Sequence, residues 1–351
     1  MKDIARRFPE NPILIPNNIK PSNYGLNVIC LLNPGVFTFE GKIWLLIRVA
    51  ENVAPKIGMI SFPVLDEWGN INVLDVTEND MYLDASDPRV MSYKDQDYLT
   101  TLSHLRLVCS EDGIHFYEPE NIKTILTGSG TSESFGIEDC RVSKIEDTYY
   151  LTYTAVSASG VGVGLRTTKD WQRFESFGMI FPPHNKDCAI FEEKINGKFY
   201  ALHRPSSVQL GGNYIWIAES PDGIHWGNHR CIIKTRKDLW DSARVGAGAA
   251  PILTEKGWLE IYHGANEQHQ YCLGAFLMDI NDPYKVISRT TLPIMVPAEE
   301  YELTGFFGQV VFTNGHIVNG DELTVYYGAA DEFVCGAKFS IQKILSLLES
   351  I

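Results

Sequence analysis

One carboxylate and several cations stand out among the polar residues, because they fall at the turns and ends of apolar strand patterns. Asp139 lies in the segment Gly136-Ile-Glu-Asp-Cys-Arg141. The candidate cations are Arg48, Lys186, Arg204, Arg244 and His263. One proton donor among several cations suits attack by an anion, and inorganic phosphate is the obvious one, since guanidinium groups match its oxygens bidentately. A water nucleophile would need a second carboxylate to activate it.

Each of these residues also has a structural explanation, because Asp and Arg at strand turns commonly cap strands or form ion pairs. Arg48 is the clearest exception, since it stands in the apolar run Ile43–Ala50. A guanidinium in such a run needs a partner or an anionic ligand, as burying it bare is costly. Asp87 and Arg89 belong to turn chemistry instead.

A repeat of about 50 residues must position these side chains. Asp139-Cys-Arg-Val and Asp187-Cys-Ala-Ile each precede an aromatic strand, and the aspartates are 187 − 139 = 48 residues apart. Asp87-Pro-Arg-Val opens a similar unit 139 − 87 = 52 residues earlier, and units at Gly248 and Gly308 continue the series. Short strands at this period predict an all-β, five-bladed β-propeller. We expect a first unit, Asn33 to Ile47, to share a blade with the end of the chain.

Composition limits the function classes. The chain has 351 residues, of which 44% are hydrophobic, and a formal net charge of −14, which argues against a nucleic-acid-binding surface. No apolar run is long enough to span a membrane. The polar N-terminus lacks a signal-peptide core, and seven cysteines without a C-x-x-C pair are typical of reduced thiols, so we expect a cytoplasmic protein.

We expect one catalytic domain over residues 1–351, with no linker or composition shift to mark a second. Residues 1–21 form an N-terminal arm that could reach a neighbouring subunit in a homo-oligomer. Apolar residues at 341, 344, 345, 347 and 348 predict a short C-terminal helix over residues 341–351. Clustered Cys and His, H-E-x-x-H and calcium-loop spacings are absent, so neither a metal nor a cofactor is expected.

Several motifs together resemble glycoside hydrolase family 130, the β-mannoside phosphorylases and their hydrolytic relatives. The resemblance runs from Asn33 to Asp331. It rests on Gly136-Ile-Glu-Asp-Cys-Arg141, Asn185-Lys-Asp187, Leu202-His-Arg-Pro205, Gly246-Ala-Gly-Ala-Ala-Pro251, Trp258-Leu-Glu-Ile-Tyr-His-Gly264 and Gly328-Ala-Ala-Asp331.

This resemblance implies an inverting phosphorolysis of β-mannosides that releases α-mannose 1-phosphate. Asp139 would be the acid, donating its proton through the 3-hydroxyl of the mannosyl ring. Phosphate would be held by Lys186, Arg204, Arg244 and His263. The mannoside would be held by Asn33, Arg48, Glu138, Arg141 and Asp331. Cys140 stands where many relatives have proline, and Arg244 where some have lysine.

Three functions stay open at this point. The first is a cytoplasmic phosphorylase acting on β-1,2- or β-1,4-linked mannooligosaccharides or a mannosyl disaccharide, with Tyr271 or Phe306-Phe307 as candidates for lining the acceptor side. The second is an inverting β-mannosidase that uses water, with Glu138, Glu192 or Glu260 as the base. The third is a non-catalytic propeller that binds carbohydrate. Retention of all four basic candidates favours the first.

Overall fold

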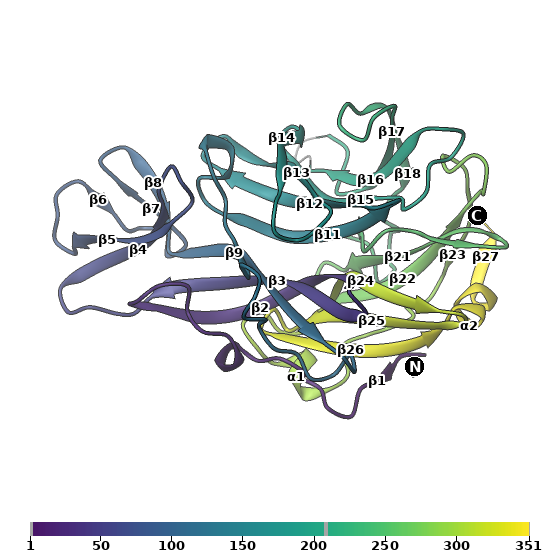
Figure 1. Ribbon diagram of the computed structural model, residues 1–351, viewed down its shortest axis with the longest axis horizontal. Coiled ribbons are helices and arrows are strands. Elements are labelled where there is room, and N and C mark those ends of the chain that lie inside the picture. Colours follow the sequence, from purple (N-terminus) through teal and green to yellow (C-terminus); the bar gives the residue numbers. More distant parts are fainter. Residues whose placement is uncertain (1–2, 207–209, 351) are drawn as a thin grey trace.

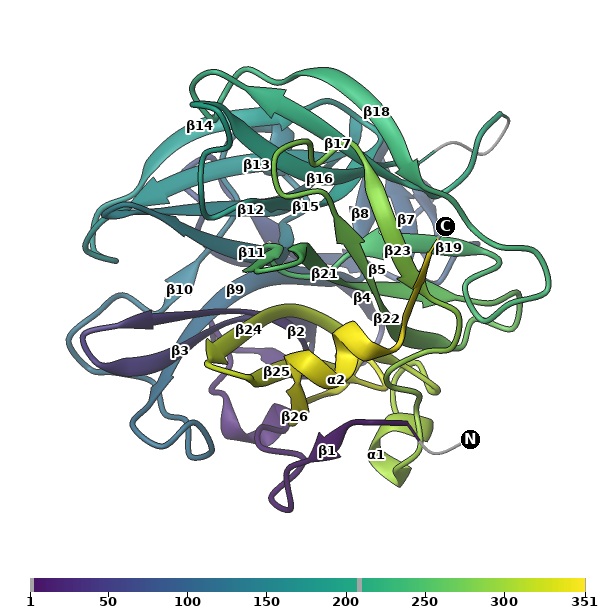
Figure 2. The same ribbon diagram turned by 90° about the vertical axis from the view of Figure 1, so that its right-hand side faces the viewer.

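Five antiparallel sheets form the body of the molecule (Figures 1 and 2). The structure is a computed structural model and describes residues 3–206 and 210–350. Blade one contains β2 (Leu26–Phe39), β3 (Lys42–Val53), β9 (Thr101–Ser110) and β10 (Ile125–Leu126). Blade two contains β11 (Ile137–Ile145), β12 (Thr148–Ser157), β13 (Gly160–Thr168) and β14 (Glu175–Phe181). Blade three contains β15 (Asn185–Ile190), β16 (Phe199–Pro205), β17 (Ile215–Ser220) and β18 (Gly227–Ile233).

The last two blades complete the five expected from the repeat. Blade four contains β19 (Arg244–Ala247), β20 (Ile252–Thr254), β21 (Gly257–Ala265), β22 (Tyr271–Met278), β23 (Val286–Thr290) and β27 (Leu348–Ser350). Blade five contains β24 (Val311–Asn319), β25 (Glu322–Ala329), β26 (Phe333–Ser340) and β1 (Arg6–Arg7). The five-bladed, all-β architecture predicted from the sequence is confirmed.

The ring closes differently from our expectation. The unit from Asn33 to Ile47 is the β2–β3 hairpin and belongs to blade one, so it shares no blade with the end of the chain. The N-terminal arm closes the ring instead, because β1 pairs with β26 as the outer strand of blade five. An arm strand can do this because the outer edge of a blade leaves backbone groups unpaired.

The unit at Asp87 is not a blade either. Residues 54–100 are inserted between β3 and β9 and fold as two small sheets that project from the propeller (Figure 1). One is the hairpin of β4 (Met59–Leu65) and β5 (Ile71–Thr77). The other contains β6 (Leu83–Asp84), β7 (Val90–Tyr93) and β8 (Gln96–Leu99). The expected turn at Asp87 is present, since its carboxylate accepts a hydrogen bond of 2.8 Å from the amide of Arg89.

The C-terminal helix begins where the apolar spacing predicted, but it is shorter. Helix α2 (Ile341–Ser346) lies against the strands of blade five (Figure 2). Its side chains Ile341, Ile344 and Leu345 are buried in a core shared by blades four and five. The chain then forms β27, which pairs with the edge strand β23 of blade four. A strand therefore replaces the last turn of the expected helix.

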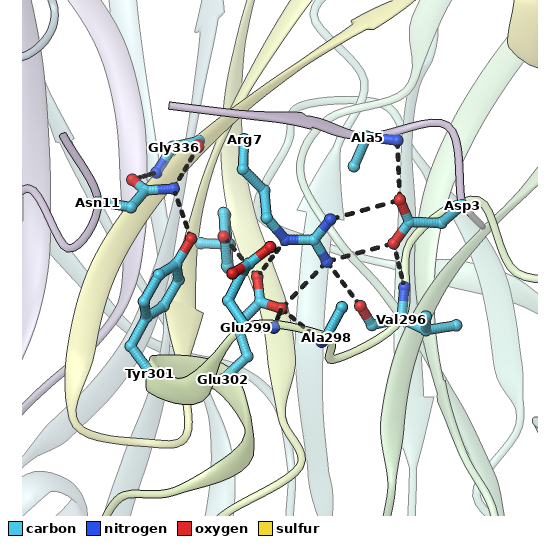
Figure 3. A network of polar contacts seen from close by, with 11 residues as sticks. Asp3, Ala5, Arg7, Asn11, Val296, Ala298, Glu299, Tyr301, Glu302 and Gly336 are labelled. Carbon is cyan, nitrogen blue, oxygen red and sulfur yellow. Dashed lines mark hydrogen bonds and ion pairs between the residues drawn. The ribbon is translucent and has the colours of Figure 1, made fainter. Parts of the chain in front are cut away.

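The N-terminal arm is docked on its own propeller by a buried ion pair (Figure 3). Arg7 donates from Nε to Glu302 Oε1 at 2.7 Å and is also paired with Asp3. Glu302 lies in the short helix α1 (Glu300–Leu303) and also accepts the hydroxyl proton of Tyr327 at 2.7 Å. Residues 3–14 of the arm therefore brace blade five, whatever the oligomeric state.

Large side chains fill the spaces between neighbouring blades. Phe37 of blade one stacks on Trp171 of blade two with ring centroids 3.7 Å apart, and Tyr149 packs against both. These contacts fix each blade against the next, so the inner strands surround one axis. The inner strands β11 and β24 begin beside the first residues of β9 and β22, as the parallel bridges Ser103–Gly136 and Tyr271–Val310 show.

All five inner strands therefore begin at the same end of the propeller. The loops that precede them lie at that end, as do the turn between β25 and β26 and the insertion of residues 54–100. We call this end the upper face. Loops rather than strands carry most binding residues in such folds, so the upper face is where a site is expected.

Candidate active site

A bulge with left-handed backbone recurs in the inner strands of blades one to three. Asn33, Asp139 and Asp187 have φ of 34°, 48° and 53°, and each lies where the pairing with the next strand shifts register. Asn and Asp tolerate this conformation better than most residues. A bulge re-aims a side chain, and bulges are frequent beside active sites. Three equivalent bulges therefore turn three polar side chains toward the propeller axis.

Asp139 lies in a polar cluster built from blades one and two. Its Oδ1 accepts hydrogen bonds from Asn33 Nδ2 at 3.1 Å and from Arg48 at 3.3 Å. Arg48 also binds Glu138 Oε1 at 2.8 Å and Ser103 Oγ at 3.0 Å. Arg48 thus has the carboxylate partners that its place in an apolar strand required. The side chains of Arg48, Glu138 and Asp139 all keep some exposure, so a ligand can reach them.

Asp187 occupies the equivalent position in blade three but is fully buried. Its carboxylate lies 3.2 Å from Arg141, 3.1 Å from Arg204 and 3.2 Å from the Nε2 of His263. Gly246 makes this approach possible, because a Cβ there would collide with Asp187 Oδ2 and His263 Nε2. Burial opposes ionisation of Asp187, but Arg204, Arg141 and His263 outweigh it and hold its pKa well below the usual value.

Two further cations lie beside this cluster. Lys186 is paired across the strands with Arg204, and it forms no ion pair with any residue in the described ranges. Arg244 donates from NH1 to the hydroxyl of Tyr271 at 2.9 Å. Lys186, Arg204 and Arg244 lie at the upper ends of strands β15, β16 and β19, so blades three and four concentrate positive charge at the upper face.

Asp331 approaches the same region from blade five. It has φ of 52° and lies in the turn between β25 and β26, directly after Ala330. Burial raises its pKa to about 6; Arg48 opposes the rise and Asp139 reinforces it. The backbone places this turn against blade one, because the amide of Leu31 in β2 donates to Glu332 O at 3.1 Å.

The environment of Asp139 favours its ionised form. Burial raises its pKa, but the charges of Arg48, Arg141 and Lys186, helped by the hydrogen bond from Asn33, lower it below the usual value. Without a ligand, Asp139 therefore carries no proton near neutral pH. A reaction that needs an acid here must first protonate Asp139.

All ten residues expected in the site come together, but two of them are not open to a ligand. Arg141 is 1% exposed and donates to Gly248 O, Asp139 O, Ala247 O and Asp187, so it braces the inner strands of blades two, three and four. His263 is fully buried behind Asp187, and burial lowers its pKa to about 4. Both position other groups in this structure.

The glutamates considered as bases for water are placed less favourably. Glu260 is buried, accepts the amide proton of Gly248 at 2.8 Å, and has a pKa raised well above its usual value by burial. Glu192 contacts the amide of Lys144 at the opposite end of the axis, where Val36, Val142 and His316 surround a cavity of about 320 Å³. Glu138 alone lies in the site, where it is paired with Arg48.

Two site residues have roles that the sequence pattern did not indicate. Asp187 opens a repeat in the sequence, at the position that Asp139 occupies in the repeat before it. This equivalence is the signal that could have identified Asp187 as a site residue. Tyr271 is a candidate for the acceptor side, yet its hydroxyl binds Arg244. Within the described residues there is no group of three or more His, Cys, Asp and Glu side chains placed to hold a metal ion. No helix there is long and apolar enough to cross a membrane.

Comparison with known proteins assigns the sequence to a family. The family model for glycoside hydrolase family 130, described as β-1,4-mannooligosaccharide phosphorylase, matches residues 100–350. The chain belongs to glycoside hydrolase family 130. Within the family it is 45% identical over 349 residues to a β-1,2-mannobiose phosphorylase of Listeria innocua, with 98% of each chain covered. It is 39% identical over 236 residues to a 1,2-β-oligomannan phosphorylase of Thermoanaerobacter, covering 66% of this chain and 77% of the relative.

Solved structures of the family have the same fold. The Listeria innocua phosphorylase in complex with β-1,2-mannobiose superposes with a TM-score of 0.89 over 98% of both chains, at 44% identity. A family 130 structure whose description concerns hydrolases that target β-1,2 mannosidic linkages in Candida mannan superposes with a TM-score of 0.75 at 21% identity. The superposition covers 97% of this chain and 95% of the other chain. At this identity it supports the fold alone.

Proposed function

We propose that this family 130 member is a β-1,2-mannobiose phosphorylase that releases α-mannose 1-phosphate and mannose. The chain is a β-mannoside phosphorylase, and its full-length similarity to the Listeria innocua enzyme supports the β-1,2 linkage. The observation that carries the phosphorolytic reaction is the group of Lys186, Arg204 and Arg244 around Asp187 and Tyr271, of which Lys186 also acts on the charge of Asp139. These cations provide a site for a second anionic substrate.

The roles of the residues follow from their exposure. Arg48, Glu138 and Asp331 hold mannosyl hydroxyls on one side of Asp139, and Asn33 orients the Asp139 carboxylate. Lys186, Arg204 and Arg244 hold phosphate on the other side, while Arg141 and His263 fix Asp187, which in turn orients Arg204. Phosphate attacks the anomeric carbon from the face opposite the leaving oxygen, so the β-mannoside gives an α-phosphate.

The proton balance explains how an ionised Asp139 can act as an acid. Hydrogen phosphate and mannobiose give mannose 1-phosphate and mannose, so phosphate loses one proton and the leaving oxygen gains one. Binding this dianion beside Asp139 adds negative charge and raises the pKa of Asp139. Asp139 then takes up a proton from water and delivers it to the leaving group, through the 3-hydroxyl if the enzyme follows the route that the family resemblance implies. The phosphate hydroxyl releases its own proton to water as mannose 1-phosphate forms, so the reaction has no net change in protons.

The cations stabilise charge where it changes during the reaction. Fixed donors in a site that excludes water stabilise a transition state more than flexible ones, because they need no reorganisation. Arg204 is held by Asp187 and Arg244 by Tyr271, so both are oriented before phosphate arrives. Lys186 has no carboxylate partner among the described residues, so its charge is available to the ligand.

The test is incubation with β-1,2-mannobiose and β-1,4-mannobiose, each with and without inorganic phosphate, followed by assay of mannose 1-phosphate and free mannose. We expect mannose 1-phosphate from the β-1,2 substrate only when phosphate is present. Mannose release at equal rates with and without phosphate would establish a hydrolase. Binding of mannobiose without any product would establish a carbohydrate-binding propeller.

The cellular compartment that we expect for the protein suits a phosphate-dependent enzyme. The seven cysteines are free, and six of them are buried, which suits a reducing compartment. We propose a cytoplasmic location, where phosphate is abundant and a sugar phosphate is retained. A homo-oligomer stays a prediction, and its measurement is the mass of the protein in solution by light scattering.

A further inference from the structure

A loop of blade five joins the sugar side of the site to its phosphate side. This rim loop, residues 304–309, follows helix α1 and precedes the inner strand β24 at the upper face. At one end the amide of Phe307 donates to Ala330 O at 3.0 Å, next to Asp331. At the other end Gln309 O accepts the amide proton of Tyr271 at 3.0 Å, and the hydroxyl of this same tyrosine binds Arg244.

The rim loop is held rigidly from below. Helix α1 contributes the buried carboxylate of Glu302, which accepts hydrogen bonds from Arg7, from the Tyr327 hydroxyl and from the amide of Ala298 (Figure 3). Gly305 packs so closely against Ala330 that a Cβ would contact the Ala330 methyl at 2.7 Å. A loop tied down at both ends and from beneath presents its side chains in a fixed position.

Two aromatic rings on this loop are unusually exposed. Phe306 and Phe307 leave 66% and 43% of their surfaces accessible, and His269 lies edge-on to Phe307 with ring centroids 6.2 Å apart. Exposed rings beside a polar site indicate a binding function, since adjacent apolar surface costs solubility without one. The C–H face of a pyranose ring packs on such a surface while its hydroxyls stay hydrated.

We propose that the rim loop is the binding site for the leaving mannose, with Phe306 as its apolar platform. Asp331 holds the mannosyl unit that receives phosphate. The glycosidic bond to be cut is next to that unit, so the leaving mannose lies beyond it, on the side of the rim loop. The loop is fastened directly to Ala330, which places the backbone of Phe307 beside the residue that precedes Asp331. This inference rests on the proposed phosphorolysis, and it assigns to the rim loop the recognition of the acceptor, which is the leaving mannose.

The synthetic direction gives the direct test, because the leaving mannose is then a substrate with its own KM. Initial rates are measured with mannose 1-phosphate and increasing mannose for the wild type, Phe306→Ala and Phe306→Tyr. We expect Phe306→Ala to raise the KM for mannose about tenfold, equivalent to about 1.4 kcal/mol. The KM for mannose 1-phosphate is expected to stay unchanged, and Phe306→Tyr, which keeps the ring, is expected to keep the wild-type KM for mannose.

A matched control separates this effect from a general loss of fold. Leu253 is 42% exposed on β20, at the opposite end of the propeller, and Leu253→Ala is expected to change neither KM. An unchanged KM for mannose in Phe306→Ala would overturn the inference, as would an equal rise in both KM values. If the wild type forms no mannose 1-phosphate from mannobiose and phosphate, the proposed function itself is wrong, independently of the rim loop.

Discussion

Replacement of Asp139 by Asn tests the acid role most directly. Asn keeps the shape of the side chain, and its carbonyl oxygen can still accept the hydrogen bonds from Asn33 and Arg48. It also tolerates the left-handed backbone at this position, where φ is 48°. Arg48 stays paired with Glu138. The variant therefore removes the proton and the charge while leaving the surrounding structure in place.

The magnitude follows from the contribution of a positioned acid, which is about 10²–10⁴-fold. At about 1.4 kcal/mol for each factor of ten, the barrier for mannobiose should rise by about 3–5 kcal/mol. An aryl β-mannoside with a nitrophenyl leaving group expels a stable phenolate and needs no proton. With this substrate and phosphate, Asp139→Asn should keep most of the wild-type rate.

The assay is kcat/KM for mannose 1-phosphate formation from both substrates, measured in Asp139→Asn and in the neighbouring variant Glu138→Gln. Glu138 also pairs with Arg48, so its loss weakens sugar binding and lowers both rates by the same factor. An equal loss on both substrates in Asp139→Asn would refute the acid role. Near-normal activity on mannobiose would remove Asp139 from the chemistry altogether.

Three further outcomes follow from the described contacts. Lys186→Ala should raise the KM for phosphate about tenfold or more, because it removes a charged hydrogen bond, and should leave the KM for mannobiose unchanged. The control is Lys144→Ala at the opposite end of the axis, which should change neither KM. Because burial raises the pKa of Asp331 to about 6, protonation below that pH should lower kcat/KM for mannobiose, and Asp331→Asn should be less active but lack this acid limb. Glu302→Gln breaks a buried ion pair with Arg7 and should destabilise the fold by about 3 kcal/mol in urea titration, whereas the exposed Glu300→Gln in the same helix should change stability little.

The fold could be predicted from the sequence because each true blade opens with an identifiable turn. Asp139 and Asp187 lie 48 residues apart in equivalent bulges, so the repeat alone assigns equivalent positions to two members of the site. The unit at Asp87 misled the blade assignment, because the small strands of the insertion have the same turn and alternation as blade strands. The sequence pattern of a single strand does not determine which sheet the strand joins.

Ring closure and the chain end could not be predicted for a related reason. Both β1 and β27 are very short and pair with the outer strands β26 and β23. Their position depends on unpaired edges that exist only once the blades have formed. The apolar residues at 347 and 348 continue a helical spacing, yet Leu348 is recruited by β23, so tertiary pairing overrides the local preference.

The two equivalent aspartates show how one backbone device yields two chemical roles. Asp139 and Asp187 share the bulge, the left-handed φ and a cationic neighbourhood, and both have lowered pKa values. Asp187 is enclosed by Arg141, Arg204 and His263 and has no access to a ligand, so its charge can only orient the phosphate cations. Asp139 is partly exposed, and one of its cations, Lys186, has no ion-pair partner in the described ranges and can turn to an incoming anion. Binding of that anion weakens the hold on the Asp139 carboxylate, which lets this aspartate alone pick up and release a proton during the reaction.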